Sequence, residues 1–271
     1  MKRAAASPSW IRPAILVFAV LSPIWTIFWL RNDWVVALIP LFASHMLLLY
    51  PTLVSQSQWW GPVIRAFETP RREVWITIDD GPTPAHTRKI LEALERHCAR
   101  ATFFVVGSCA KNAPHLVEEI LRRGHAVANH TFTHPSRSLW CAGPGRITNE
   151  IDRCGEAISG DANRSDLLFR APAGLKNPFV HPALARRGML LVGWTVRGLD
   201  TWRRDPFAIA AKINRKARPG AIILLHEGHH LEKSPDLNPR CLELTLQGLA
   251  QNGYQFVIPH VEQLRTTSVG K

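Results

Sequence analysis

The N-terminal part of the chain carries two long stretches of mostly apolar residues without charge, 13–30 and 34–54, separated by the polar segment Arg31-Asn32-Asp33. Each stretch approaches the ~20 apolar residues that a helix needs to cross the hydrocarbon core of a bilayer. The pattern therefore predicts a transmembrane helical hairpin over residues 1–54. A secretory signal peptide is the alternative, because positive residues precede the first stretch. The absence of a clear cleavage site between the two stretches favours the hairpin.

From about residue 72 onward, strand-like and helix-like patterns alternate. Short runs rich in β-branched and aromatic residues predict strands at 74–78, 101–106, 125–129, 167–170, 190–195, 221–226 and 255–258. Amphipathic runs predict helices at 87–98, 114–124, 148–159, 182–188, 206–217 and 242–252. Alternation of this kind indicates a parallel sheet, and a barrel is the economical way to close it. We therefore expect an α/β fold, a (β/α) barrel with about seven parallel strands.

These patterns divide the chain into four parts. Residues 1–54 form the membrane-anchoring hairpin, and residues 72–262 form the α/β domain. Between them, residues 55–71 contain Ser-Gln-Ser-Gln and two turns with proline, which is typical of a juxtamembrane linker. Residues 263–271 are expected to be a flexible tail.

The formal net charge of +12 suits an anionic partner, either nucleic acid or a phospholipid or polyprenyl-phosphate surface. The chain has no basic run with interleaved aromatic residues and no zinc-finger spacing, which argues against nucleic acid and for a membrane. The 5 cysteines are irregularly spaced and include no CxxC pair, so they predict neither a disulfide framework nor a thiolate zinc site.

Basic residues gather at both ends of the predicted hairpin, in segments 2–12 and 65–72, whereas its connection holds Arg31 as its only basic residue. By the positive-inside rule, both ends face the cytoplasm. We therefore expect the α/β domain on the cytoplasmic face of a membrane, such as a bacterial inner membrane. The prolines inside the two stretches leave a re-entrant or interfacial segment as the alternative.

Two adjacent carboxylates, Asp79 and Asp80, follow the first predicted strand directly, and Gly81-Pro82 comes next. Neighbouring residues of a strand point to opposite faces, so both carboxylates can reach one site only if the strand breaks here. The Gly-Pro pair supplies such a break. A solvated turn that happens to contain two aspartates is the alternative, because Asp-Gly is a common turn dipeptide.

Two histidines, His130 and His134, follow the strand predicted at 125–129. Their spacing places both imidazoles on one face of a helical turn, where both can bind one metal ion. Together with an aspartate they suit zinc or another borderline divalent ion, and three protein ligands leave positions for water and substrate. Because active-site residues of barrels collect at the carboxyl ends of the strands, this position favours a ligand role over chance spacing.

Three more strand ends carry polar residues: 169–174, 199–202 and 222–226. With the two segments above, they form five site elements in chain order on one alternating scaffold. This arrangement resembles the polysaccharide deacetylases of the NodB-homology type, carbohydrate esterase family 4, over about residues 72–262. The resemblance implies a distorted (β/α) barrel of the NodB type.

The resemblance also implies roles for single residues. Thr77-Ile78-Asp79-Asp80-Gly81 is similar to the family's TFDDG motif, which implies Asp79 as catalytic base and Asp80 as metal ligand. His130 and His134 match the family's H-[ST]-x-x-H motif and are implied as the other two ligands. The metal would be one zinc ion, with cobalt, nickel or manganese as alternatives.

The Leu-x-His motif matches His226, implied as general acid, and Leu224, implied as a wall of the acyl pocket. The arginine-proline motif matches Arg170 and Pro172. Ala173 follows where the family often has an aromatic residue. Its backbone N–H is implied as an oxyanion donor, because such a donor needs no particular side chain.

The Asp-Trp motif is met by Asp200 and the substrate-contacting Trp202, with one extra residue between them, and Arg197 stands where a further aspartate is usual. We expect Arg170 and Asp200 to form an ion pair that orients Asp79 and tunes its basicity, or alternatively a structural salt bridge.

The sequence therefore predicts a membrane-anchored, metal-dependent deacetylase that removes the N-acetyl group of an amino sugar in a glycan or lipid-linked glycan. The expected partners are this glycan or glycolipid and membrane lipid, without nucleic acid. A deformylase or other N-deacylase of a lipid-linked sugar is the first alternative. A non-catalytic glycan- or lipid-binding module is the second, and the retention of the base, the three metal ligands and the acid argues against it.

Overall fold

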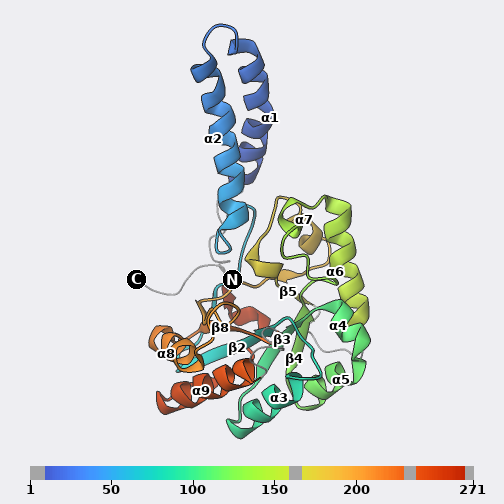
Figure 1. Cartoon of the computed structure of the whole chain (residues 1–271), viewed down its shortest axis with the longest axis vertical. Helices are drawn as coiled ribbons and strands as arrows, with labels where there is room; N and C mark the ends of the chain where they lie inside the picture. The colour runs from blue at the N-terminus through green and yellow to red at the C-terminus, as the bar shows by residue number, and fades with distance from the viewer. Residues whose placement is uncertain (1–9, 159–166, 229–235, 266–271) are drawn as a thin grey trace.

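The computed structural model describes residues 10–158, 167–228 and 236–265, which form a helical hairpin and an α/β domain (Figure 1). The hairpin consists of α1 (Ile11–Trp29) and α2 (Trp34–Leu53). Asp33 caps α2, because its carboxylate accepts the backbone N–H groups of Val35 and Val36. Polar contacts join the two helices at small residues, as in membrane bundles: Ser22 and Ser44 at 2.8 Å, and the Thr26 hydroxyl to the Ala37 carbonyl at 2.8 Å.

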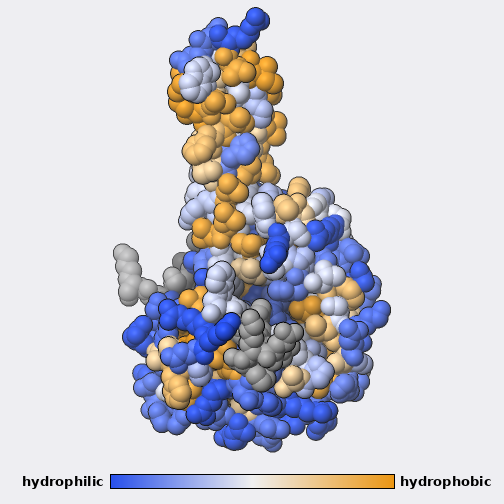
Figure 2. All heavy atoms as spheres, in the orientation of Figure 1, coloured by the Kyte–Doolittle hydropathy of each residue, from blue (hydrophilic) through white to orange (hydrophobic). Residues whose placement is uncertain are grey.

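The outer surface of the hairpin is apolar, in contrast to the mostly hydrophilic domain surface (Figure 2). Both helices are long and apolar enough to cross a membrane, and only 11% and 22% of their most apolar windows are buried. The core helix of a soluble protein would be mostly buried. A signal sequence near the N-terminus would have the same length and composition.

The domain is built on one mostly parallel sheet with the strand order β10-β1-β8-β2-β3-β4-β5-β6. Two further strands pair at its centre, β7 with β8 and β9 with β2. The strands are β1 (Ala66–Phe67), β2 (Glu73–Asp79), β3 (Ala101–Val105), β4 (Ala126–Asn129), β5 (Leu168–Phe169), β6 (Leu190–Leu191), β7 (Val196–Arg197), β8 (Ala221–His226), β9 (Gln255–Phe256) and β10 (Leu264–Arg265). The predicted α/β fold, a distorted barrel, is confirmed.

Helices cover the outside of this sheet (Figure 1). They are α3 (Thr87–Arg96), α4 (Gly107–Asn112), α5 (Pro114–Arg122), α6 (Pro144–Ile158), α7 (Val180–Ala185), α8 (Pro206–Lys216) and α9 (Leu237–Gln251), with 3-10 turns at Leu139–Cys141, Pro172–Gly174 and Val261–Gln263. The main core packs alternate residues of β2, such as Ile76 and Ile78, against helix residues such as Leu94 and Leu246. The opposite face of β2 is buried too, with Trp75 fully enclosed beside Phe104 and Ile222. Burial on both faces explains the nearly continuous apolar sequence of β2 and β8.

The segment 55–71, expected to be a linker, is instead part of the domain. Its β1 strand pairs antiparallel with β10 and β8, and Trp60 and Phe67 are buried. Residues 264–265 of the expected tail form β10, and residues 266–271 lie outside the described part. These strands are only two residues long, so they show no periodicity that a sequence pattern could reveal.

Candidate active site

The two adjacent aspartates lie where β2 ends, and the backbone turns sharply between them. Asp79 is the last residue of β2, whereas Asp80 has a positive φ of 74°. This left-handed conformation breaks the strand alternation, so both carboxylates face one cleft. Gly81 has no room for a side chain, because a Cβ there would fall 1.4 Å from Oε1 of Glu227. The predicted strand break is therefore present.

His130 and His134 lie in an irregular loop after β4, so the helical turn expected from their spacing is wrong. Thr131 and His134 have positive φ values of 69° and 52°, which no helix allows. Glu150 on α6 holds this loop, because its carboxylate accepts the backbone N–H groups of Phe132 (3.0 Å) and Thr133 (2.8 Å). It also accepts the Thr133 hydroxyl at 2.6 Å. Sequence reasoning missed Glu150, because nothing in the local pattern links it to the histidines.

The side chains of Asp80, His130 and His134 nevertheless converge. One potential ligand atom from each lies within 4.8 Å of those of the other two. Oδ1 of Asp80 lies 3.2 Å from Nε2 of His130 and 3.0 Å from Nε2 of His134. Nδ1 of His130 donates to the Arg170 carbonyl at 2.8 Å, so in the neutral ring the lone pair is on Nε2, the atom that would bind a metal ion. This donor set fits a divalent ion such as zinc.

The charge around His130 favours a cation. Burial by itself would lower the pKa of His130, but the carboxylates of Asp79 and Asp80 outweigh it and raise that pKa. The same negative field that favours a proton on the imidazole favours a metal ion between these side chains.

Arg170 binds Asp79 directly. Its Nη1 donates to Oδ1 of Asp79 at 2.6 Å and to the Thr77 hydroxyl at 2.9 Å. The rest of the guanidinium donates to the carbonyls of Val192 (3.3 Å) and Gly193 (2.9 Å). The group is buried and lies over the ring of Phe104, 4.0 Å from its centre. Arg170 therefore fixes Asp79 in one orientation.

Asp200 binds His226, so the expected ion pair between Arg170 and Asp200 is not formed. Asp200 Oδ1 lies 3.0 Å from Nδ1 of His226, and Oδ2 accepts the His226 backbone N–H at 2.7 Å. Burial alone would lower the pKa of His226, but the carboxylate of Asp200, helped by those of Asp80 and Asp79, outweighs burial and raises this pKa to about 9. Arg170 and Asp200 therefore bind different side chains, Arg170 the carboxylate of Asp79 and Asp200 the imidazole of His226.

Comparison with known proteins assigns this arrangement to a family. Residues 67–192 match the polysaccharide deacetylase family model. A chitooligosaccharide deacetylase of Bradyrhizobium sp. (strain ANU 289) is 33% identical over 71% of this chain and 85% of its own length. The chain belongs to the polysaccharide deacetylase family. It is therefore a hydrolase of carbon–nitrogen bonds other than peptide bonds.

Other deacetylases are similar over comparable lengths. A peptidoglycan-N-acetylglucosamine deacetylase of Bacillus cereus is 31% identical over 70% of this chain and 89% of its own length. The solved structure of a family 4 carbohydrate esterase from Streptomyces lividans, in complex with acetate, superposes with a TM-score of 0.63 at 30% identity, covering 72% of this chain and 97% of that chain.

Eight of the eleven predicted site residues line one cleft of about 720 Å³. Those that line it are Asp79, Asp80, His130, His134, Ala173, Trp202, Leu224 and His226. Ala173 has a positive φ of 54°. Arg170, Pro172 and Asp200 are buried and do not line the cleft. Ser136, Arg137 and Arg203, which sequence reasoning did not single out, also line the cleft, as do Gly174, Trp194, Arg197, Leu199 and Thr201.

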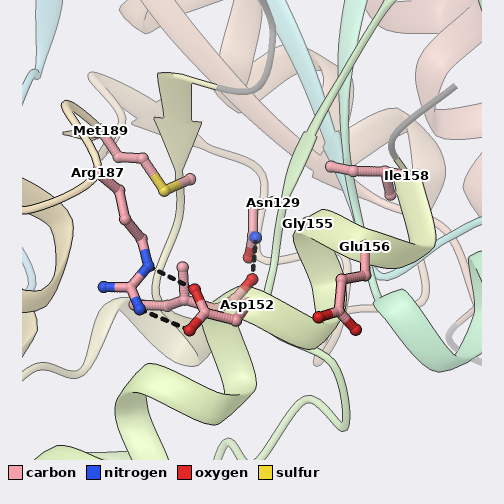
Figure 3. Close-up of a pocket in the computed structure, with 8 residues that line it drawn as sticks. Asn129, Asp152, Gly155, Glu156, Ile158, Arg187 and Met189 are labelled. Carbon is pink, nitrogen blue, oxygen red and sulfur yellow. Dashed lines mark hydrogen bonds and ion pairs between the residues drawn. The ribbon is translucent and has the colours of Figure 1, made fainter. Parts of the chain in front are cut away.

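A second hollow, lined by residues from β4, α6 and the segment after α7, is held by paired polar groups (Figure 3). Arg187 binds the Asp152 carboxylate through two nitrogens, and the Asn129 amide donates to the Ile151 carbonyl at 2.8 Å. The amide oxygen of Asn129 also accepts the backbone N–H of Thr131 at 3.0 Å. These contacts tie α6 to the start of the histidine loop, which is a structural role.

Proposed function

We propose that the protein is a membrane-anchored, metal-dependent deacetylase that hydrolyses the N-acetyl group of an amino sugar in a glycan or lipid-linked glycan. The carrying observation is that one cleft brings together three metal-ligand candidates, a carboxylate held by arginine and an imidazole held by aspartate. The deacetylase names of the relatives support the reaction type.

Asp80, His130 and His134 would hold the metal ion. Two imidazoles and one carboxylate suit zinc, and cobalt, nickel or manganese are the alternatives. When bound, a divalent ion supplies positive charge that lowers the pKa of a water molecule and polarises a carbonyl oxygen. Asp79 and His226 line the same cleft, so the ion would supply this chemistry between the proposed base and the proposed acid.

Asp79 is the proposed base. Arg170 and its neighbours keep the carboxylate fixed, so it can accept a proton from the water that attacks the acetyl carbon. The backbone N–H of Ala173, at the wall of the cleft, is the proposed donor to the oxyanion that forms. Leu224 and Trp202, which also line the cleft, are the proposed contacts of the substrate's acyl group and sugar. Pro172, which the sequence assigned to substrate binding, is buried outside the lining of the cleft and is not proposed as a contact.

His226 is the proposed acid. Its Nδ1 is engaged by Asp200, so the transferable proton is on Nε2. The raised pKa, about 9, keeps the ring protonated at neutral pH. The ring can then protonate the amine as the carbon–nitrogen bond breaks, without which amide cleavage would stall.

The hairpin supports a membrane site of action. We infer that α1 and α2 anchor the enzyme, with the domain on the cytoplasmic face of a bacterial inner membrane, because basic residues flank the hairpin on the domain side. An anchored enzyme gains effective concentration for a substrate in the same membrane. A lipid-linked amino sugar is therefore the favoured substrate.

The test is the identity of the acid released from a membrane lipid extract by zinc-loaded protein. Acetate would support the deacetylase, and formate or a longer acid would replace it with the N-deacylase alternative. If the extract bound the protein but no acid were released from lipid or from soluble chito-oligomers, the non-catalytic module would be the better account. Equal activity on soluble chito-oligomers and on lipid would contradict the lipid-linked substrate.

A further inference from the structure

The rim of the cleft carries three arginines, Arg137 from the loop after β4, Arg197 from β7 and Arg203 from the turn that follows β7. All three are exposed, whereas the two aspartates lie deep in the cleft. Arg197 lies near the ring of Trp194, 5.9 Å from its centre, and the ring of Trp202 is 86% exposed. The rim is therefore both cationic and aromatic, while the floor is anionic.

The guanidinium groups of these arginines make no hydrogen bond or ion pair with any residue that the structure describes. Elsewhere on the domain, arginines such as Arg88 and Arg187 bind carboxylates. The positive charge of the rim extends to α8. The pKa of Lys212 is lowered by partial burial and then by nearby cations, Arg197 and Arg203 among them. Excess positive charge at the mouth of a cleft attracts an anion.

The wall of this cleft is in contact with the chain just after α2, at the end of the hairpin that meets the domain. The amide of Gln56, three residues beyond α2, donates to the carbonyl of Trp194 at 2.8 Å. Gly174 lies so close to Ser55 that a Cβ there would be 2.5 Å from the Ser55 Cβ. The buried Nζ of Lys176 donates to the carbonyls of Val54 (3.0 Å) and Ser55 (2.9 Å), which anchors the end of α2. The cleft wall therefore lies within a few residues of the proposed membrane surface.

Building on the proposed deacetylase function, we propose that Arg137, Arg197 and Arg203 bind a phosphate group of the substrate, the one that links its amino sugar to a membrane lipid. Guanidinium groups match the charge and geometry of phosphate oxygens and can bind them in pairs. A neutral glycan would give these three exposed cations no anionic partner, whereas a sugar joined to lipid through phosphate would place its anion beside the end of α2. The exposed tryptophans offer apolar faces to the sugar.

The direct test measures the binding of N-acetylglucosamine 1-phosphate and of N-acetylglucosamine to the full-length, zinc-loaded protein in detergent, with Asp79→Asn to prevent turnover. We expect the combined variant Arg137→Gln, Arg197→Gln and Arg203→Gln to lose affinity for the sugar phosphate by about tenfold or more relative to the sugar. Arg204→Gln is the matched control, since Arg204 is an exposed neighbour that does not line the cleft. Equal loss for both ligands, or none, would overturn the phosphate site.

A second arm separates the two sources of phosphate by using N-acetylglucosamine linked to polyprenyl phosphate in micelles. A membrane-lipid source predicts that the lipid-linked sugar binds more tightly than the soluble sugar phosphate, and that the arginine variant weakens both. Equal binding of the two would contradict the lipid source. Acid release is scored separately. If wild type released no acid but the arginine-dependent binding persisted, the proposed deacetylase would fail and the phosphate site would stand.

Discussion

Asp79 and His226 line the same cleft but have partners of opposite charge, Arg170 for the first and Asp200 for the second. Partners of this kind let one site hold a base and an acid together. The sequence singled out all four residues through its motifs. It could not tell which bound which, because the pairing depends on side-chain directions across 91 residues for Arg170 and Asp79. In place of the expected ion pair between Arg170 and Asp200, the structure has two, one between Arg170 and Asp79 and one between Asp200 and His226.

Replacement of Asp200 tests the acid at the residue scale. A general acid acts only while protonated, so activity is present below the pKa of His226 and is lost as pH rises through about 9. Asp200→Asn removes the carboxylate that raises this pKa, so the alkaline limb of the kcat/KM profile is expected to shift to lower pH. An alkaline limb that stays in place would mean that another group is the acid.

Replacement of Arg170 tests the other pair. Both charges are almost fully buried, so Arg170→Met would leave an uncompensated carboxylate and is expected to destabilise the domain by about 3 kcal/mol or more. For a domain of this size the melting temperature should fall by about 6 °C or more, together with kcat. Arg170→Lys is the control that keeps the charge without the guanidinium fork. A melting temperature within a degree of wild type for Arg170→Met would contradict a buried ion pair.

At the scale of elements, the strands that carry the proposed catalytic residues were predictable because they are buried on both faces. The predicted strand at 221–226 matches β8 residue for residue, and those at 101–106 and 125–129 each differ from β3 and β4 by one residue. The conformation after β4 was not predictable. The carboxylate of Glu150, on a helix that comes later in the chain, binds two backbone N–H groups of the histidine loop. An HxxxH spacing taken alone favours a helix instead.

The loop anchor gives a prediction for metal affinity. Glu150→Ala removes the acceptor of two backbone N–H groups beside His134, so the ligands lose their fixed positions and zinc affinity is expected to fall by about 10- to 100-fold. Competition with a chelator measures this loss. Glu156→Ala, an exposed glutamate on the same helix, is the matched control. If both variants bound zinc like wild type, the loop would not depend on Glu150.

At the scale of the whole molecule, the hairpin and the domain are joined by contacts that a linker would not make. Trp60 donates to Thr52 of α2 at 3.1 Å, and Lys176 holds the carbonyls at the end of that helix. The sequence predicted the two helices from their uninterrupted apolar runs. It could not show that the segment between them and the domain is buried, because a buried tryptophan and an interfacial one have the same sequence signal.

The anchor predicts how the protein fractionates. If α1 and α2 span a membrane, the full-length protein is expected to stay with the membrane pellet after extraction with alkaline carbonate, and its mass to include residues 1–54. Two membrane-spanning helices also place both chain termini on the same side of the membrane. A tag at the N-terminus and a tag at the C-terminus are therefore expected to be labelled from the same side. A soluble product that begins after the first apolar stretch would show that the stretch is a signal peptide.

The central claim is that metal binding and proton abstraction belong to different neighbouring aspartates. The measurement is bound zinc per chain together with acid release from the same samples of wild type, Asp79→Asn and Asp80→Asn. We predict that wild type binds zinc and releases acetate, that Asp79→Asn binds zinc without releasing acid, and that Asp80→Asn loses both. Acid release by Asp79→Asn at the wild-type rate would contradict the assignment of the base, and full zinc binding by Asp80→Asn would contradict the metal site.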